Sequence, residues 1–233
     1  MKNLDVLYED NHIIVVNKKA SEIVQADKKE DESLEDKVKQ YIKEKYNKPG
    51  DVFLGVVHRL DRPVSGALIF ARTSKALVRI NEMLKNKEIK KTYWAIVKER
   101  PEVFEATLTH FITKNEEKNK ANCHDKKVKN SKEAILDYRM IGESENYYLL
   151  EIDLKTGRHH QIRAQLAKIG CPIKGDLKYG SPRSNTDKSI SLHARKLSFT
   201  HPIKKELIEI TAPVPSDTLW RALEKVYKYQ LTD

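Results

Sequence analysis

Residues 56–75 read VVHRLDRPVSGALIFARTSK and place one aspartate, Asp61, between two arginines at the end of an apolar run. The apolar residues on both sides predict buried strands. A turn between them is predicted from Arg62, Pro63, Ser65 and Gly66. We therefore expect Asp61 on a loop at a strand end, a place where catalytic groups are commonly displayed, and the arginines suit a carboxylate that stays ionised. A structural Asp–Arg pair in a tight turn would give the same pattern, so this stretch alone leaves both interpretations open.

The length and charge of the chain limit what surrounds this stretch. Its 233 residues suffice for one large domain or two small ones, and we expect a single domain over residues 1–233. Lys and Arg number 44 against 34 Asp and Glu, which gives a net charge of +10. Such a balance favours a polyanionic partner, with nucleic acid as the leading candidate. The alternative is a lysine-rich surface that serves solubility alone.

Several classes of protein lack support in the sequence. The two cysteines, Cys123 and Cys171, are widely spaced, which indicates neither a disulfide scaffold nor a zinc site and fits a reducing cytosol. The N-terminal residues lack the apolar core of a signal peptide, and no run approaches the roughly 20 apolar residues of a membrane span. No glycine-rich phosphate loop follows a predicted strand. We predict a cytoplasmic protein that needs no metal and no cofactor.

The pattern of apolar residues predicts many strands with helices interspersed irregularly. The expected strands are 4–8, 12–17, 92–97, 104–110, 133–141, 147–154, 189–193, 196–200 and 206–211. Helices are expected from a Ser33 cap to residue 46, from 74 to 84, from 158 to 168, and after a Ser216 cap. The lysine-rich segment, residues 114–132, holds seven lysines and predicts an exposed loop or a long hairpin tip. These elements favour an α+β fold with a mixed, largely antiparallel central sheet flanked by helices and loops.

Four polar segments stand out against this framework. They are HRLD at 58–61, KTYWAIV at 91–97, TGRHHQIRAQLA at 156–167 and LHARKLSFTHP at 192–202. Each has a plain structural explanation when taken alone, since Tyr93, for instance, is typical of a half-buried strand aromatic. Their order and identity together closely resemble the RluA-type family of pseudouridine synthases. Asp176, Tyr179 and Gly180 match a further G-D-x-x-Y-G segment of that family.

The resemblance covers residues 4 to 214 and implies the pseudouridine synthase catalytic fold. Some residues depart from the family pattern: residues 17–21 read NKKAS in place of N-K-P-x-G, His159 stands where Thr or Ser is common, and Gln165 stands where His is common. Some relatives carry an N-terminal S4-type RNA-binding domain. Because the first predicted hairpin begins at Leu4, we expect a stand-alone catalytic domain here.

The resemblance implies an enzyme that isomerises specific uridines in ribosomal or transfer RNA. The uracil is detached from the ribose, rotated and rejoined through C5, so no atom is gained or lost. The family's catalytic aspartate falls on Asp61, its active-site tyrosine on Tyr93 and its arginine on Arg163. We expect Arg163 to pair with Asp61 and Tyr93 to stack under the uracil. Whether Asp61 adds at C6, attacks C1′ or assists glycal formation stays open.

RNA is the expected partner of a monomeric protein that does not bind membranes. The target uridine must leave its helical stack, and Arg59 is placed to fill the vacated space. The full set of expected RNA contacts is Arg59, Arg62, Arg158, His160, Gln161, Lys126, Lys127 and Lys129, with Leu192 as an apolar wall of the active site. Two alternatives stay open. One is a noncatalytic RNA-binding or RNA-folding factor on the same fold, and the other is a metal-free hydrolase that uses Asp61 as its nucleophile.

Overall fold

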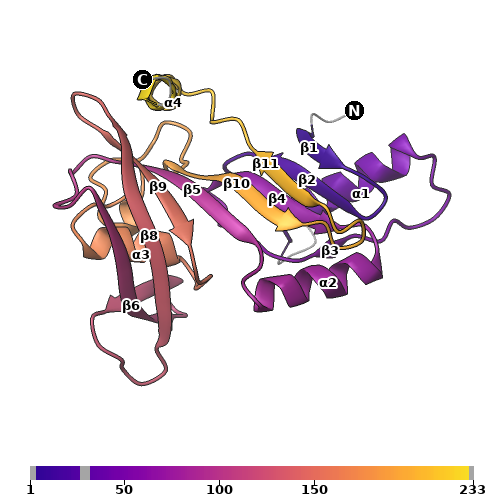
Figure 1. The fold of residues 1–233 in the computed structure, drawn as a ribbon, viewed down its shortest axis with the longest axis horizontal. Coiled ribbons are helices and arrows are strands. Elements are labelled where there is room, and N and C mark those ends of the chain that lie inside the picture. The colour runs from indigo at the N-terminus through magenta and orange to yellow at the C-terminus, as the bar shows by residue number, and fades with distance from the viewer. Residues whose placement is uncertain (1–3, 27–31, 231–233) are drawn as a thin grey trace. The chain divides into compact units, whose positions relative to one another are not determined.

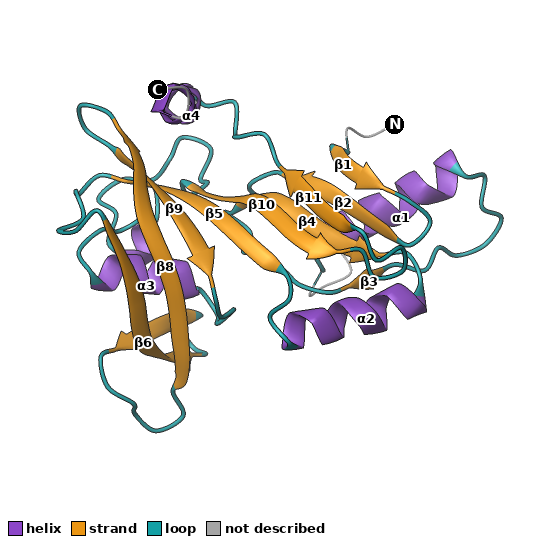
Figure 2. Ribbon diagram, in the orientation of Figure 1, coloured by secondary structure: helices purple, strands orange, loops and turns teal. Residues whose placement is uncertain are grey.

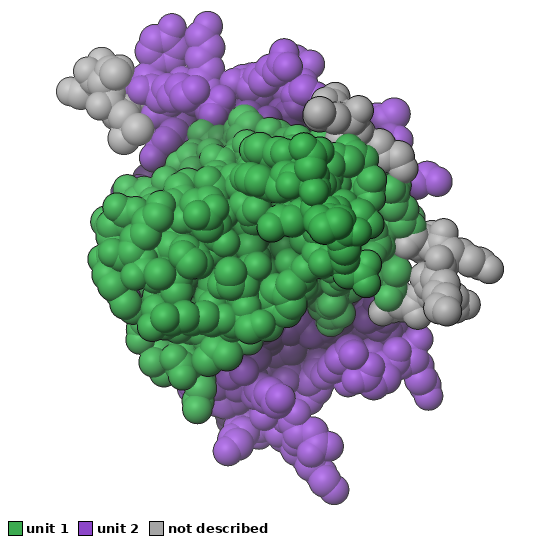
Figure 3. Space-filling view, turned by 90° about the vertical axis from the view of Figure 1, so that its right-hand side faces the viewer, with its two compact units in different colours: residues 1–89, 194–213 green, residues 90–193, 214–233 purple. Residues whose placement is uncertain are grey.

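The chain forms an α+β structure that divides into two compact units. The computed structural model describes residues 4–26 and 32–230, which form eleven strands, four α-helices and one short 3-10 helix. Unit 1 comprises residues 1–89 and 194–213, and unit 2 comprises residues 90–193 and 214–233 (Figure 3). Each unit is described below by itself.

Unit 1 is a sheet with two helices (Figures 1 and 2). Its elements are β1 (Val6–Glu9), β2 (Ile13–Lys18), α1 (Leu34–Lys45), β3 (Gly55–Val56), β4 (Ser65–Ala71), α2 (Ser74–Lys85), most of β10 (Leu192–Thr200) and β11 (Leu207–Thr211). The strand order is β1-β2-β4-β10, with β3 on β4 and β11 on β10. All seven residues of β4 are buried, and Ile80 of α2 packs into the same core as Ile69. The segment that follows the Asp61 loop is therefore the centre of this unit.

Local sequence signals predicted much of unit 1 correctly. The opening hairpin is present as β1 and β2, which pair antiparallel. Helix α1 begins where expected, because the Ser33 side chain accepts from the backbone of Asp36 while the Asp36 carboxylate accepts from the backbone of Ser33. Helix α2 is capped by Thr73. These features depend on residues only a few positions apart, which explains why the sequence predicts them.

Two predictions in unit 1 are wrong. Ser65 and Gly66 belong to β4 rather than to a turn. Gly66 has a φ of +119°, and a Cβ there would lie 2.3 Å from the carbonyl oxygen of Ala194, so the glycine permits a close backbone approach. The strands expected at 189–193 and 196–200 are one strand, β10. Within this strand, Lys196 pairs with Glu209 on β11 at 2.8 Å.

Unit 2 holds the antiparallel strands at the other end of the same strand order, together with the helices α3 and α4 (Figure 2). Its elements are β5 (Lys90–Val97), β6 (Glu105–Asn115), β7 (Lys120–His124), β8 (Lys132–Glu143), β9 (Tyr148–Leu154), α3 (Gln161–Lys168), the 3-10 helix η1 (Leu177–Tyr179) and α4 (Thr218–Gln230). The strand order is β5-β9-β8-β6-β7. Helix α4 packs its Trp220 with Trp94 of β5, and helix α3 packs its Ala164 with Ala134 of β8.

The two helices of unit 2 lie on opposite faces of the sheet, as the register shows. Tyr93 pairs with Ile152, and Ile152 pairs with Tyr138. Since side chains alternate along a strand, Tyr138 and Ala134 share one face of β8, which is the face that α3 covers. Tyr93 therefore faces the α3 side, and its neighbour Trp94 faces α4.

Three features of unit 2 differ from the predictions: an additional strand, the start of one helix and the cap of another. The lysine-rich segment contains a strand, β7, because Ala121 is buried and packs in the cluster under α3. Helix α3 begins at Gln161 rather than at residue 158, since His160 has a left-handed backbone with a φ of +49°. Helix α4 is capped by Asp217 rather than by Ser216, because its Oδ1 accepts from the backbone N–H groups of Leu219 and Trp220.

Candidate active site

Asp61 lies on the loop between β3 and β4, partly exposed, and the backbone of unit 1 holds that loop in place. The Asp61 carbonyl oxygen accepts from the Val64 N–H at 3.0 Å. Ser21, beyond the end of β2, donates its N–H to the Arg62 carbonyl oxygen at 2.8 Å. Arg62 in turn donates from Nε to the carbonyl oxygen of Ser21 at 3.2 Å. The loop is thus closed on itself and bonded to a second segment.

A buried lysine, Lys18, anchors the same loop from within. Its side chain is fully buried, and Nζ donates to the carbonyl oxygens of Lys19 at 3.1 Å, Arg62 at 3.1 Å and Val64 at 2.7 Å. Burial lowers the pKa of Lys18 to about 8, although the carboxylates of Glu22 and Asp61 partly oppose this. Lys18 was not among the site residues predicted from the sequence. The available signal was a lysine that ends the apolar strand IIVVNK.

Replacing Lys18 with methionine should destabilise the protein and slow its reaction. Three carbonyl oxygens would lose the Lys18 ammonium, but those of Lys19 and Arg62 keep a backbone donor, so the loss falls mainly on the oxygen of Val64. A buried acceptor without a donor costs about 1–3 kcal/mol, so we expect a net loss of about 2 kcal/mol. Thermal melting and the rate of the proposed reaction would measure both effects. Lys19→Met is the control, because Lys19 is the exposed neighbour. Equal behaviour of the two variants would contradict the anchoring role of Lys18.

The same variant also shows how the contribution of Lys18 to the free energy of unfolding depends on pH. The folded-state pKa of Lys18, about 8, lies below the ordinary lysine value of 10.5. Between these two values the unfolded chain binds the proton more tightly than the folded chain, so this group makes stability rise with pH there. The free energy of unfolding of the wild type, minus that of Lys18→Met, should therefore increase from pH 8 to pH 10.5. Urea unfolding across this window measures it, and a flat or falling difference would refute the assignment.

In unit 2 the predicted arginine is held by a buried carboxylate. Arg163 donates from Nε to Oδ2 of Asp176 at 2.7 Å and from Nη2 to Oδ1 at 2.9 Å. Both side chains are buried, with exposed fractions of 5% and 1%. The guanidinium also lies 4.9 Å from the centre of the Tyr179 ring. This two-pronged contact fixes the plane of the guanidinium. The expected pairing of Arg163 with Asp61 stays a prediction.

Tyr179 connects α3 to the lysine-rich segment. Its hydroxyl oxygen accepts from the backbone N–H of Ala121 at 2.7 Å and lies 3.0 Å from Nδ1 of His160. The ring of Tyr179 lies against Arg163. One aromatic side chain therefore contacts β7, the residue before α3 and the candidate catalytic arginine.

The turn before α3 is fastened to β8 by side chains. The Gln161 amide oxygen accepts from the Thr156 hydroxyl at 2.7 Å and from the Arg158 N–H at 3.0 Å, while its amide nitrogen donates to the Ile135 carbonyl oxygen at 3.1 Å. Arg158 donates from Nε to the carbonyl oxygen of Glu133 at 2.8 Å. The side chain of Gln161 is buried, so the structure gives it a role in holding the turn. Its expected contact with RNA stays a prediction.

The other predicted site residues divide by exposure. Tyr93 and Leu192 are buried, with Tyr93 on the α3 face of unit 2. Arg59 and Arg62 are exposed on the Asp61 loop. The three lysines of the β7–β8 connection, Lys126, Lys127 and Lys129, are exposed as well. Unit 1 thus holds Asp61, Arg59 and Arg62, and unit 2 holds the remaining predicted residues.

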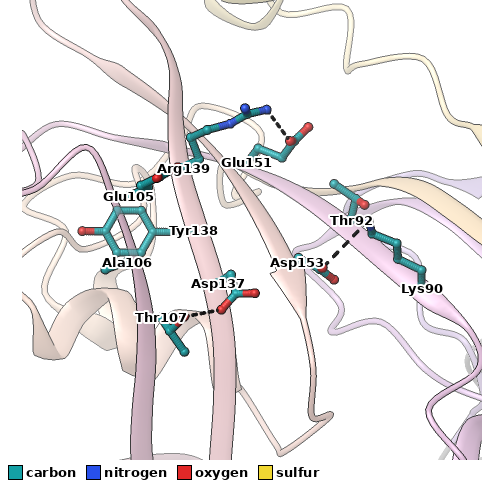
Figure 4. Close-up of a pocket in the computed structure, with 10 residues that line it drawn as sticks. All are labelled: Lys90, Thr92, Glu105, Ala106, Thr107, Asp137, Tyr138, Arg139, Glu151 and Asp153. Carbon is teal, nitrogen blue, oxygen red and sulfur yellow. Dashed lines mark hydrogen bonds and ion pairs between the residues drawn. The ribbon is translucent and has the colours of Figure 1, made fainter.

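A polar groove of about 530 Å³ lies on the other face of unit 2 (Figure 4). Its walls include four carboxylates, those of Glu105, Asp137, Glu151 and Asp153. Several already have partners: Thr107 donates to Asp137 at 2.7 Å, and Arg139 lies 3.2 Å from Glu151. None of the predicted site residues lines this groove, so it is separate from the candidate active site.

Comparison with known proteins identifies the class of this chain. The sequence model of the RNA pseudouridylate synthase family matches residues 12–168. The tRNA pseudouridine synthase C of Vibrio cholerae is 31% identical, over 97% of this chain and 97% of that protein. The ribosomal large subunit pseudouridine synthase D of Xylella fastidiosa is 33% identical, over 92% of this chain and 67% of that protein. Another relative, an RNA pseudouridine synthase of Synechocystis, is 32% identical over 91% of this chain, which spans 66% of its length.

A solved structure shows the same fold. The human protein RNA pseudouridylate synthase domain containing 4 superposes with a TM-score of 0.77, at 20% identity, over 96% of this chain and 93% of that one. The chain belongs to the RNA pseudouridylate synthase family. This confirms the predicted fold class and the predicted class of enzyme, an isomerase that acts on RNA.

Proposed function

We propose that this chain converts specific uridines of transfer or ribosomal RNA to pseudouridine, with Asp61, Tyr93 and Arg163 at the reacting base. The observation that carries the proposal is that the segments bearing two of these residues are held rigidly: the Asp61 loop by Lys18, and Arg163 by Asp176. Fixed charged groups at a reaction centre need no reorganisation during the reaction. The three proposed active-site residues come from both units. We propose that the two units work as one catalytic domain.

The proposed reaction balances without any external group. The bond from C1′ to N1 of the uracil breaks, a bond from C1′ to C5 forms, and the proton leaves C5 while N1 gains one. Asp61 supplies the carboxylate, as a nucleophile or as the stabiliser of positive charge at C1′. Tyr93 supports the detached ring by stacking. Arg163 orients the Asp61 carboxylate through a charge-assisted contact.

The proposed RNA contacts follow the exposed basic residues. Arg59, beside Asp61, fills the space that the flipped uridine leaves. Arg62, Arg158 and His160 contact the nucleotides around it. Contacts to phosphates position RNA without reading its sequence, a role that suits the exposed lysines of the β7–β8 connection. We further propose that the protein is cytoplasmic and that it is a monomer. Light scattering on the purified protein would check its oligomeric state. Within the described part of the chain, no helix is long and apolar enough to cross a membrane.

Tritium release from RNA labelled at C5 of uridine tests the proposed function. We expect purified protein to release tritium from transfer RNA or ribosomal RNA with a chelator present and no cofactor added. Transcripts of each RNA, assayed separately, identify the substrate class. RNA binding without release from either would favour a noncatalytic RNA-binding factor. Loss of activity on chelation, restored by one metal, would contradict a cofactor-free reaction.

RNA affinity should depend on salt through the lysine-rich segment. Replacing Lys126, Lys127 and Lys129 with alanine should reduce the slope of log affinity against log salt by up to about 2, since each single-strand phosphate contact contributes about 0.7. Fluorescence anisotropy between 50 and 200 mM salt, about the range over which such slopes are resolved, measures this. The charge-matched control replaces Lys43, Lys75 and Lys85, three exposed helix lysines of unit 1. An unchanged slope would exclude the segment from phosphate contact.

A further inference from the structure

Lys91 stands on the same face of β5 as the candidate active-site tyrosine. Side chains alternate along a strand, so Lys91 and Tyr93 share the α3 face of unit 2. Lys90 and Thr92 point to the other face, where both line the polar groove (Figure 4). Two adjacent lysines of one strand therefore lie on opposite sides of the sheet.

The ammonium group of Lys91 has no partner among the residues that the structure describes. The side chain is only partly exposed, and burial lowers its pKa below the ordinary lysine value. On the opposite face the lysines have carboxylates: Lys90 lies 4.0 Å from Asp153, and Lys155 lies 2.5 Å from the same group. A charge that loses water without gaining a partner lowers stability. Lys91 therefore carries a cost to the fold that an anionic ligand would offset.

The ammonium lies against the backbone of the turn before α3. A Cβ added to Gly157 would meet one heavy atom within 4 Å, the Nζ of Lys91, at 3.7 Å. Gly157 itself is exposed, and in the described residues no hydrogen bond uses its N–H. The side chains of Thr156 and Gln161 hold this turn in place. A fixed, solvent-exposed backbone segment thus lies next to an unpaired, partly buried ammonium.

We propose that Lys91, together with the backbone at Gly157, binds a phosphate of the RNA next to the reacting uridine. The inference rests on the proposed function, in which the uracil stacks on Tyr93. Residues two apart on a strand are separated by about 6.6 Å, which is within the reach of one nucleotide from its base to its phosphate. Lysine suits this site because its ammonium binds phosphate as a compact point charge. The contact fixes the flipped nucleotide by its backbone.

The first test compares Lys91→Met with Lys90→Met, which remove equal charge from neighbouring positions on opposite faces. Binding of a single-stranded, uridine-rich RNA is measured by anisotropy across a salt series. The slope of log affinity against log salt should fall by about 0.7 for Lys91→Met and stay unchanged for Lys90→Met. Equal slopes for the two variants would overturn the proposal.

The second test separates binding from chemistry and from folding. On the RNA that the wild type modifies, Lys91→Met should raise KM about tenfold with kcat nearly unchanged, and Lys91→Arg should restore part of the loss. Gly157→Ala should also raise KM, because its methyl group would stand beside the ammonium without changing the charge. The melting temperature of Lys91→Met should not fall, since the variant removes an unpaired charge. A fall in kcat at constant KM, or a lower melting temperature, would overturn the proposal.

Failure of this inference can be told apart from failure of the proposed function. If the wild type releases tritium from RNA while Lys91→Met matches Lys90→Met in slope and KM, the phosphate site is refuted and the function stands. If the wild type releases none, the function fails. The difference in salt slope between the two variants then still decides whether the α3 face binds phosphate.

Discussion

Replacing Asp61 with asparagine should abolish pseudouridine formation and leave the protein folded. Asparagine keeps the shape of the side chain but removes the negative charge that the proposed reaction needs at the flipped base. The loss should be about 10⁴-fold or more, the scale on which removal of a reacting carboxylate acts. Folding should survive, because the Asp61 loop is held by the backbone carbonyls of Arg62 and Val64 and by the Asp61 carbonyl, none of which the substitution changes.

Three measurements on one preparation decide this prediction: thermal melting, RNA affinity, and pseudouridine formation in a single turnover. Asp51→Asn is the matched control, since it removes the same charge from an exposed position of unit 1. The control should retain full activity. A variant Asp61→Asn that melts like the wild type and still forms pseudouridine at a comparable rate would show that Asp61 is not the reacting carboxylate.

The second large effect is expected on stability, from Asp176→Asn. Arg163 and Asp176 form a buried pair, and removing one partner leaves a buried charge uncompensated. Such a change costs about 3–5 kcal/mol. For a chain of this size this corresponds to a fall in melting temperature of about 10 °C. Activity should fall as well, because the contact that sets the plane of the Arg163 guanidinium is lost.

Two further variants make the second prediction specific. Asp137→Asn breaks the half-exposed pair of Asp137 with Lys155 at 3.1 Å and should cost at most about 1 kcal/mol. The double variant Arg163→Met with Asp176→Leu replaces the buried pair by apolar side chains and should regain most of the lost stability without regaining activity. A double variant that melts as low as Asp176→Asn would show that packing, rather than unpaired charge, causes the loss.

The sequence predicts those features that depend on near neighbours. The Ser33 cap, the hairpin of β1 and β2, and the start of α2 each involve residues within a few positions. Strand β7 was missed because lysines dominate the surrounding segment, residues 114–132, whereas Ala121 and Cys123 on the inner face of the strand pack under α3. The single strand β10 was predicted as two, because its continuity depends on pairing with β11, which lies further along the chain.

The candidate site was predicted from family resemblance, and its supports were not predicted at all. Asp61, Tyr93 and Arg163 were assigned by motif, whereas composition and spacing alone left structural explanations open. Lys18 reaches Val64 across 46 positions, and Arg163 reaches Asp176 across a turn that no local rule specifies. Contacts of this kind depend on how distant segments meet in the fold. Such contacts can be identified only from the three-dimensional structure.

The close backbone approach at Gly66 affects how substitutions in this protein should be interpreted. Any other residue there would bring its Cβ to 2.3 Å from the Ala194 carbonyl oxygen and would also adopt an unfavourable φ. Position 66 should therefore be as intolerant of substitution as position 61, although the glycine touches no substrate and transfers no proton. A mutational scan would mark both positions as essential for unrelated reasons. Activity measured per folded molecule, rather than per cell, is the quantity that would separate the two.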